Sequence, residues 1–198
     1  MIAGVLVPGI GYTTQAPLLS FAAAALERHG AQVEHVSWRI PAGLNRTAQA
    51  AFVRENVSAA LDRMPAGATP VLIAKSIGTM SAPLAAERRI PVVWLTPLVA
   101  FDFVADAIRN NPAATLLIGG AADEVWNGAA VRSMGRPFLE IPDGDHALFV
   151  PGPLRRSAEV LGEVATAIEK FLDGGSSCTP SRSSTEPTVR PTPSPTDI

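Results

Sequence analysis

The chain of 198 residues contains one cysteine, three histidines and only 17% charged residues. The lone Cys178 excludes a disulfide within the chain and a metal site built from several cysteines. A formal net charge of −2 gives no electrostatic reason to expect nucleic acid or an anionic membrane as a partner. No apolar run reaches the roughly 20 residues that a membrane-spanning helix needs. The first residues lack the basic stretch of a signal peptide, so we expect a buried first strand and a cytoplasmic protein.

Hydrophobic residues make up 47% of the sequence, which is enough for one packed core, but the length is too short for two ordinary domains. The composition changes at Gly174, after which Ser, Thr, Pro and Gly dominate. Such a segment buries too little apolar surface to offset the entropy lost on ordering. We therefore predict one domain over residues 1–173 and a disordered tail over residues 174–198.

Strand-like and helical patterns alternate along this domain. Apolar segments typical of buried strands cover residues 2–8, 31–38, 69–76, 91–97, 114–120 and 137–142. Helical spacing covers residues 16–30, 46–64, 103–111 and 126–134, a segment after Ser76, and a last helix that begins at Pro153. The apolar face of that last helix comprises Leu154, Leu161, Val164, Ile168 and Phe171. Apolar strands that alternate with helices predict an α/β fold, a three-layer α/β/α sandwich around a mostly parallel six-stranded sheet.

The stretch PVLIAKSIGTM, residues 70–80, places Ser76 where a buried strand turns into a helix. The carboxyl ends of the strands are where parallel sheets bind ligands. A sharp turn there lifts a serine hydroxyl clear of the sheet and needs small flanking residues, which Ala74 and Gly78 supply. The helix that follows also points its first amides at negative charge that develops during attack. An ordinary helix N-cap is the alternative interpretation of this serine.

Two side chains that could activate Ser76 follow later strands. Asp123 comes in the loop after residues 114–120, and His146 comes in the loop after residues 137–142. Because the carboxyl ends of parallel strands meet at one edge of the sheet, the three side chains can meet there. The order Ser, Asp, His along the chain is that of one particular triad scaffold.

Other residues compete for the roles of acid and base. Asp102 follows the fourth strand, Asp145 adjoins the candidate histidine, and Asp143 is a candidate turn residue. His29 lies at a helix end and His35 inside a strand pattern, so neither follows a strand as a catalytic base on this scaffold should.

With these motifs the sequence resembles the α/β-hydrolase superfamily, specifically a small member without a lid, over about residues 2–172. The resemblance implies that Ser76 is the nucleophile, that His146 is the general base, and that Asp123 orients the histidine. It also implies a cofactor-free and metal-free site.

The resemblance extends to the loop VLVPGIGYTT, which corresponds to the family's oxyanion loop, with Pro8 where histidine is common. It implies that the backbone amides of Ile10 and Ile77 form the oxyanion hole. Gly11 and Tyr12 are the alternatives to Ile10.

Aromatic residues that follow strand ends are candidates for lining an acyl pocket, with core packing as the alternative for each. They are Tyr12, Trp126 and Phe101, and in addition Phe103 and Phe149. We expect Lys75 to extend along the turn to solvent, the alternatives being contact with an acidic substrate or with neighbouring loops. No long insertion follows any strand, which predicts an exposed site for small or medium acyl substrates.

The predicted function is hydrolysis of a small or medium acyl ester or thioester by a carboxylesterase-like serine hydrolase. The predicted partner is that small-molecule substrate, with neither nucleic acid nor a membrane. The same fold also hosts acyltransferases and non-catalytic binding or scaffold proteins, which remain the alternatives. A dinucleotide site at residues 9–14 is disfavoured because Thr14 replaces the third glycine of the motif and Tyr12 would crowd a pyrophosphate. The pattern selects neither a substrate nor an oligomeric state.

Overall fold

The computed structural model describes residues 1–174, so the predicted tail, apart from Gly174, and Cys178 lie outside the described residues. The strands are β1 (Ile2–Val7), β2 (Gln32–His35), β3 (Thr69–Lys75), β4 (Val92–Leu95), β5 (Thr115–Gly120) and β6 (Phe138–Ile141). The helices are α1 (Pro17–Arg28), α2 (Arg46–Asp62), the 3-10 helix η1 (Ser76–Ser81), α3 (Ala82–Glu87), α4 (Asp102–Asn110), α5 (Gly128–Ser133) and α6 (Leu154–Leu172). Each predicted strand and helix has a counterpart, with bounds that differ by a few residues.

All six strands form one sheet in the order β2-β1-β3-β4-β5-β6, and every neighbouring pair is parallel. The four interior strands are almost entirely buried, as their continuous apolar sequences predict. The edge strand β2 contains polar residues and is largely exposed or half-buried, because it has a neighbour on one side only. The predicted parallel six-stranded sheet is confirmed.

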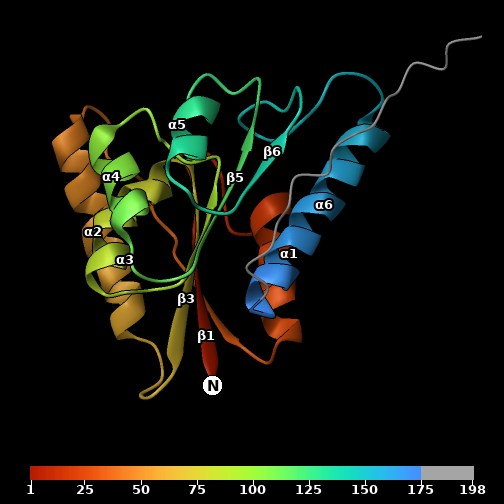
Figure 1. Ribbon diagram of the computed structural model, residues 1–198. Coiled ribbons are helices and arrows are strands. Elements are labelled where there is room, and N and C mark those ends of the chain that lie inside the picture. The colour runs from red at the N-terminus through yellow and green to blue at the C-terminus, as the bar shows by residue number, and fades with distance from the viewer. Residues whose placement is uncertain (175–198) are drawn as a thin grey trace, which may run out of the picture.

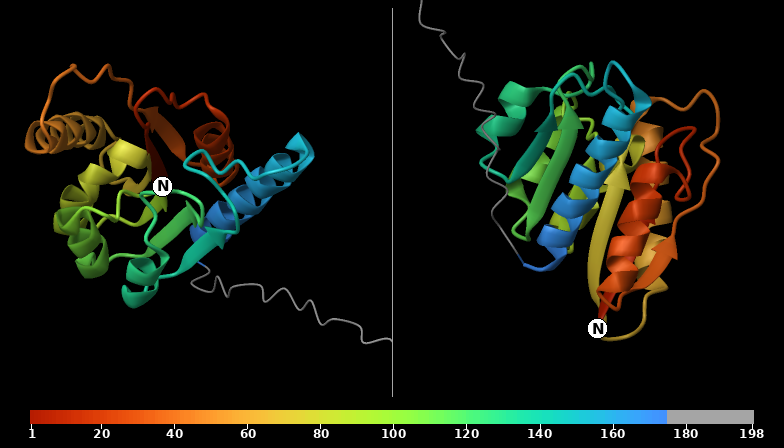
Figure 2. Two further views of the ribbon diagram at one scale, coloured as in Figure 1. Left: turned by 90° about the horizontal axis from the view of Figure 1, so that it is seen from above. Right: turned by 90° about the vertical axis from the view of Figure 1, so that its right-hand side faces the viewer.

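Helices cover both faces of the sheet (Figure 1, Figure 2). The helices α1 and α6 lie on one face and pack on Leu6 and Ile73. The helices α2, α3, α4 and α5 lie on the other face, over Val5 and Leu72. Adjacent residues of one strand serve opposite faces because side chains alternate along a strand. This arrangement confirms the three-layer sandwich.

Two helices differ in detail from expectation. The segment after Ser76 begins as the 3-10 helix η1 and becomes α-helical only at Ala82. In α6 the buried apolar residues include Val164 and Ile168, as predicted, but Leu154 is 72% exposed. The first turn of α6 extends away from the sheet, so Leu154 has no core to pack against (Figure 1). The predicted apolar face of α6 is therefore only partly buried.

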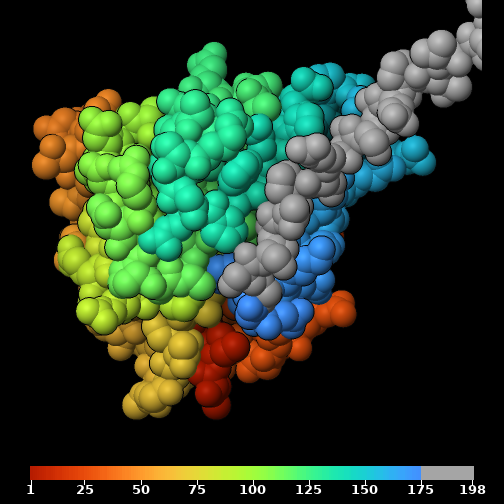
Figure 3. Space-filling model, viewed as in Figure 1, coloured from red at the N-terminus to blue at the C-terminus, as the bar shows by residue number. Residues whose placement is uncertain are grey.

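The carboxyl ends of the strands lie together at the upper edge of the molecule. The start of β1 lies at the bottom, whereas the segments after β5 and β6 lie in the upper part (Figure 3). Within residues 1–174 no lid domain covers this upper edge. No helix in the same range has the length and apolar character needed to cross a membrane.

Candidate active site

Ser76 sits at the turn between β3 and η1 with a strained backbone. Its φ of 53° lies in the left-handed region, which a non-glycine residue adopts at a cost of about 1–3 kcal/mol. A Cβ at Gly78 would come within 2.8 Å of a methyl carbon of Val7 and 3.1 Å of the carbonyl oxygen of Pro8. On the other side, Ala74 is fully buried. The small residues around Ser76 thus meet a steric demand of the turn.

The side chains of Ser76, His146 and Asp123 form a continuous hydrogen-bonded chain. With its proton on Nδ1, His146 donates to Asp123 Oδ2 over 2.7 Å and accepts from the Ser76 hydroxyl at Nε2 over 2.8 Å. The second oxygen of Asp123 accepts the amide of Val125, and the carboxylate is 3% exposed. The imidazole is 42% exposed and can therefore be reached from solvent.

The loops after β5 and β6 are tied together by backbone hydrogen bonds, which places Asp123 beside His146. The amide of Ala122 donates to the carbonyl oxygen of Gly144, and the amide of Ala121 donates to that of Ile141. Gly120 permits this approach, because a Cβ there would lie 2.0 Å from the Gly144 oxygen. These backbone bonds position Asp123 and His146 independently of their own contact.

The competing acids and histidines occupy other roles. Asp102 is the exposed first residue of α4, and Asp143 is an exposed turn residue with φ 56°. Asp145 accepts the amides of Ala147 and Phe149 and so shapes the loop that carries His146. Asp145 therefore contributes to the site by holding the backbone of the loop that carries His146.

The remaining histidines lie away from Ser76. The ring of His29, at the end of α1, donates to the carbonyl of Ala25 and contacts Asp173 Oδ1 at 2.9 Å. These contacts raise the pKa of His29 above its ordinary value. His35 is the exposed last residue of β2.

The sequence predicts that Lys75 extends into solvent. In the structure this prediction is wrong, because the residue is only 2% exposed. Its ammonium donates to Thr96 Oγ1 over 3.0 Å and to the backbone carbonyl of His146 over 2.9 Å. The same nitrogen lies 4.9 Å from the centre of the Tyr12 ring. Burial lowers its pKa to about 8, although Asp123 and Asp145 act in the opposite direction. Lys75 therefore links the end of β3 to the residue after β4 and to the loop that carries His146.

The predicted oxyanion-hole residues lie on the two segments that flank the nucleophile. A Cβ at Gly9 would lie 3.1 Å from the Cβ of Ser76, so the loop after β1 packs against Ser76, and Ile10 follows directly. The side chain of Ile10 is 66% exposed, so a role for this residue rests on its amide. Ile77 is in the first turn of η1, where amides have no partner within the helix. The assignment of these two donors stays a prediction.

The three aromatic residues proposed for the substrate pocket separate in the structure. Tyr12 lines a cavity near the site. Trp126 instead packs flat on Gly119 in the core, and its indole N–H donates to Glu140 over 2.7 Å. Phe101 stacks on Phe103 and lies beneath the guanidinium of Arg46. The structure does not bring Trp126 and Phe101 to this cavity.

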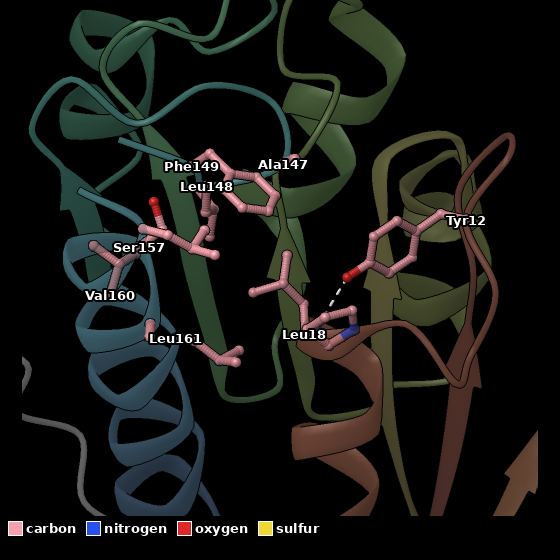
Figure 4. Close-up of a pocket in the computed structure, with 11 residues that line it drawn as sticks. Tyr12, Leu18, Ala147, Leu148, Phe149, Ser157, Val160 and Leu161 are labelled. Carbon is pink, nitrogen blue, oxygen red and sulfur yellow. Dashed lines mark hydrogen bonds between the residues drawn. The ribbon is translucent and has the colours of Figure 1, made fainter. Parts of the chain in front are cut away.

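The cavity that Tyr12 lines has a volume of about 320 Å³ and an almost wholly apolar wall. It lies between the loop after β1, the segment that follows His146, and the first turns of α6 (Figure 4). Sequence reasoning missed the contribution of α6, because Leu154 and Leu161 follow the periodicity of core residues. Phe149, which follows the sixth strand, was among the aromatic candidates and does line the cavity.

Within residues 1–174, no three His, Cys, Asp or Glu side chains gather as ligands of a metal ion would. The site described above consists of a hydroxyl, an imidazole, a carboxylate and a buried ammonium. Such a set can transfer protons and stabilise charge with its own groups.

The sequence matches no protein-family model and no curated protein. Its structure is nevertheless similar to several solved hydrolases. An α/β serine hydrolase homologue from Coxiella burnetii superposes with a TM-score of 0.66 and 17% identity, over 86% of this chain and 85% of the other. Est1E from Butyrivibrio proteoclasticus gives a TM-score of 0.67 and 13% identity, over 88% of each chain. An α/β serine hydrolase without a lid from Xanthomonas campestris gives a TM-score of 0.56 and 18% identity, over 86% of this chain and 82% of the other. By these comparisons the chain has the fold of the α/β hydrolases, and residues 1–174 carry that fold without a lid domain.

Proposed function

We propose that the protein is a serine hydrolase that cleaves small or medium acyl esters or thioesters, with carboxylesterase activity as its leading form. The observation that carries this proposal is the hydrogen-bonded chain from Ser76 through His146 to Asp123, at a strained turn on the carboxyl edge of the sheet. A structural serine has no need of a left-handed backbone or of a histidine that a buried carboxylate orients.

In the first half-reaction the Ser76 hydroxyl attacks the carbonyl carbon of the ester while His146 Nε2 takes its proton. The carbonyl π electrons move to oxygen, where the amides of Ile10 and Ile77 are the proposed donors. Asp123 stabilises the charged imidazolium without becoming protonated. The tetrahedral intermediate then collapses, the bond to the leaving oxygen or sulfur breaks, and His146 protonates the departing alkoxide or thiolate.

In the second half-reaction water replaces the departed alcohol or thiol. His146 takes a proton from this water, the resulting hydroxide attacks the acyl carbon, and the Ser76 oxygen leaves with the proton from the imidazolium. The products are the carboxylic acid and the regenerated serine. The 42% exposure of the imidazole supports access by the water that this step needs.

Small or medium substrates fit the surroundings of Ser76 best. The carboxyl edge of the sheet carries no lid in residues 1–174, so long chains have no enclosed tunnel. Two solved neighbours are described as Est1E with bound ferulic acid and a dienelactone hydrolase, which also supports small acyl compounds.

The experiment that tests the proposal is labelling with a fluorophosphonate, followed by mass spectrometry to locate the adduct. We expect rapid modification of Ser76 and none in Ser76→Ala. We expect the adduct to be lost or strongly slowed in folded His146→Ala as well, because the hydroxyl then lacks its base. Turnover of short acyl esters should fall by orders of magnitude in both variants.

An absence of adduct on the folded wild-type protein would contradict the proposal. Labelling without release of a carboxylic acid, but with transfer of the acyl group to added alcohols or amines, would replace hydrolysis with acyl transfer. Saturable binding of esters that Ser76→Ala leaves unchanged, without any turnover, would indicate a binding protein.

A further inference from the structure

The apolar cavity beside the triad is walled by side chains whose polar groups are already engaged. The Tyr12 hydroxyl accepts the amide of Leu18 over 2.9 Å, and the Ser157 hydroxyl accepts the amide of Val150 over 3.1 Å. The rest of the wall is apolar and includes Leu161. The cavity therefore suits an uncharged hydrocarbon group and disfavours a charged one, which would lose its hydration without a partner.

Two observations place this cavity near the triad. Ala147, which directly follows His146, forms part of the wall. On the opposite side Tyr12 forms another part, and the Cβ position of Gly9 lies 3.1 Å from the Cβ of Ser76 and 3.5 Å from that of Tyr12. Figure 4 shows Tyr12 and the residues of α6 on opposite sides, with Ala147 and Phe149 between them. The cavity thus lies between the loop after β1, which approaches Ser76 at Gly9, and the loop that carries His146.

The chemistry of the triad indicates which half of an ester would enter it. The imidazole that accepts the serine proton must also deliver a proton to the leaving oxygen. The group attached to that oxygen therefore lies on the histidine side, next to the residues that follow His146. Three of those residues, Ala147, Leu148 and Phe149, line the cavity.

We propose that this cavity binds the leaving group of the substrate, and that the enzyme prefers esters of apolar alcohols with several carbon atoms or one ring. The inference rests on the proposed hydrolase function and specifies its substrate class. A volume of about 320 Å³ lies at the lower end of the range for small-molecule sites, which excludes long lipid chains. Leu154 and Phe149, which are 72% and 50% exposed, form an apolar rim through which the group would enter.

The experiment compares two ester series on the wild-type protein. One series is ethyl, butyl and hexyl acetate, in which the alcohol grows. The other is ethyl acetate, butanoate and hexanoate, in which the acyl group grows. Transfer of each methylene from water into the cavity should raise kcat/KM by about fourfold. We expect this rise along the alcohol series and little change along the acyl series.

A cavity-filling variant and a matched control test the location. Ala158 is an exposed residue of α6 that lines the cavity, so Ala158→Phe fills the cavity without disturbing the core. Glu163 is an exposed residue of the same helix outside the cavity, and Glu163→Phe is the control. Ala158→Phe should lower the ratio of kcat/KM for hexyl acetate to kcat/KM for ethyl acetate by at least about tenfold, because the longer alcohol loses more apolar contact in the filled cavity. Glu163→Phe should leave both values unchanged.

Binding of 1-hexanol, measured by chemical-shift changes, is a readout that needs no turnover. We expect saturable binding to the wild type and to Glu163→Phe, and its loss in Ala158→Phe. Dependence on the acyl series, removed by Ala158→Phe, would overturn the inference by assigning the cavity to the acyl group. Flat rates in both series, or hexanol binding that Ala158→Phe leaves unchanged, would also overturn it. Failure of the proposed function is distinct, because it would appear as no fluorophosphonate adduct and no turnover of any ester.

Discussion

Replacing Lys75 by methionine should separate stability from activity. Methionine keeps the length and apolar character of the lysine stem but carries neither a charge nor a donor. The buried ammonium is disfavoured in the folded state, and its pKa falls from 10.5 to about 8. This difference corresponds to about 3 kcal/mol of stability that the folded protein lacks while the lysine is charged.

The sign of the pH dependence follows from this lowered pKa. Below about pH 8 the lysine is protonated in both states, and the folded state carries the full cost of burying the charge. Between about pH 8 and 10.5 the unfolded chain still binds the proton while the folded protein has released it, so stability rises with pH. Methionine at this position has no such dependence. The difference in free energy of unfolding, wild type minus Lys75→Met, should therefore rise by about 3 kcal/mol between pH 7.5 and pH 10.5.

Near pH 7.5 two opposing effects nearly cancel in the variant. Loss of the buried charge stabilises Lys75→Met by about 3 kcal/mol. In the opposite direction, Thr96 Oγ1 and the carbonyl of His146 lose their hydrogen-bond donor, which costs about 1–3 kcal/mol of stability for each acceptor. Turnover should nevertheless fall, because the loop of the base loses a contact that fixes its position. We expect kcat to fall between about tenfold and a hundredfold, with little change in KM.

The assay is urea denaturation at intervals from pH 7.5 to 10.5, together with steady-state kinetics on a short ester. Lys170, an exposed lysine of α6, provides the matched control Lys170→Met, which should retain the wild-type pH dependence and kcat. Parallel stability profiles for the wild type and Lys75→Met would refute the argument from burial. An unchanged kcat in Lys75→Met would refute a positioning role for its bond to the loop.

Three further changes have defined outcomes. Asp123→Asn should lower kcat by several orders of magnitude while circular dichroism stays unchanged, because an amide favours the wrong histidine tautomer; near-normal kcat would move the acid elsewhere. Gly120→Ala should lower both the melting temperature and turnover, because the added methyl group would collide with the carbonyl of Gly144 in the loop that carries His146. The control is Gly162→Ala in α6, where a methyl group meets open space and should raise the free energy of unfolding by about 0.5–1 kcal/mol. His29→Gln should destabilise the protein most below about pH 6.5, where the wild-type ring is protonated and held by Asp173. The loss should shrink as the pH rises through the raised pKa of His29. An equal loss of stability at pH 5 and pH 9 would contradict this contact.

The meeting of Ser76, Asp123 and His146 in one hydrogen-bonded chain could be predicted because the position of each residue depends on a local pattern. Ser76, Asp123 and His146 each follow a strand, and parallel strands bring such positions to one edge of the sheet. The small residues around Ser76 also indicate that strand and helix approach each other closely at the turn. Neither observation required knowledge of contacts between distant segments.

The features that sequence reasoning missed depend on such distant contacts. Lys75 is buried because Thr96 and the carbonyl of His146, 21 and 71 residues away, accept hydrogen bonds from its ammonium. A charged residue beside a turn otherwise favours solvent, as the sequence predicts. Trp126 likewise follows a strand, but Glu140 and the space above Gly119 hold it in the core.

The left-handed backbone of Ser76 also has a consequence for laboratory evolution. Glycine adopts a φ of 53° without the steric penalty that serine carries, so Ser76→Gly should stabilise the fold while removing the proposed nucleophile. A library selected for thermal resistance alone should therefore accumulate glycine at this position, and a library selected for ester turnover should retain serine. The divergence of the two populations would show that stability is sacrificed here to keep a reactive hydroxyl.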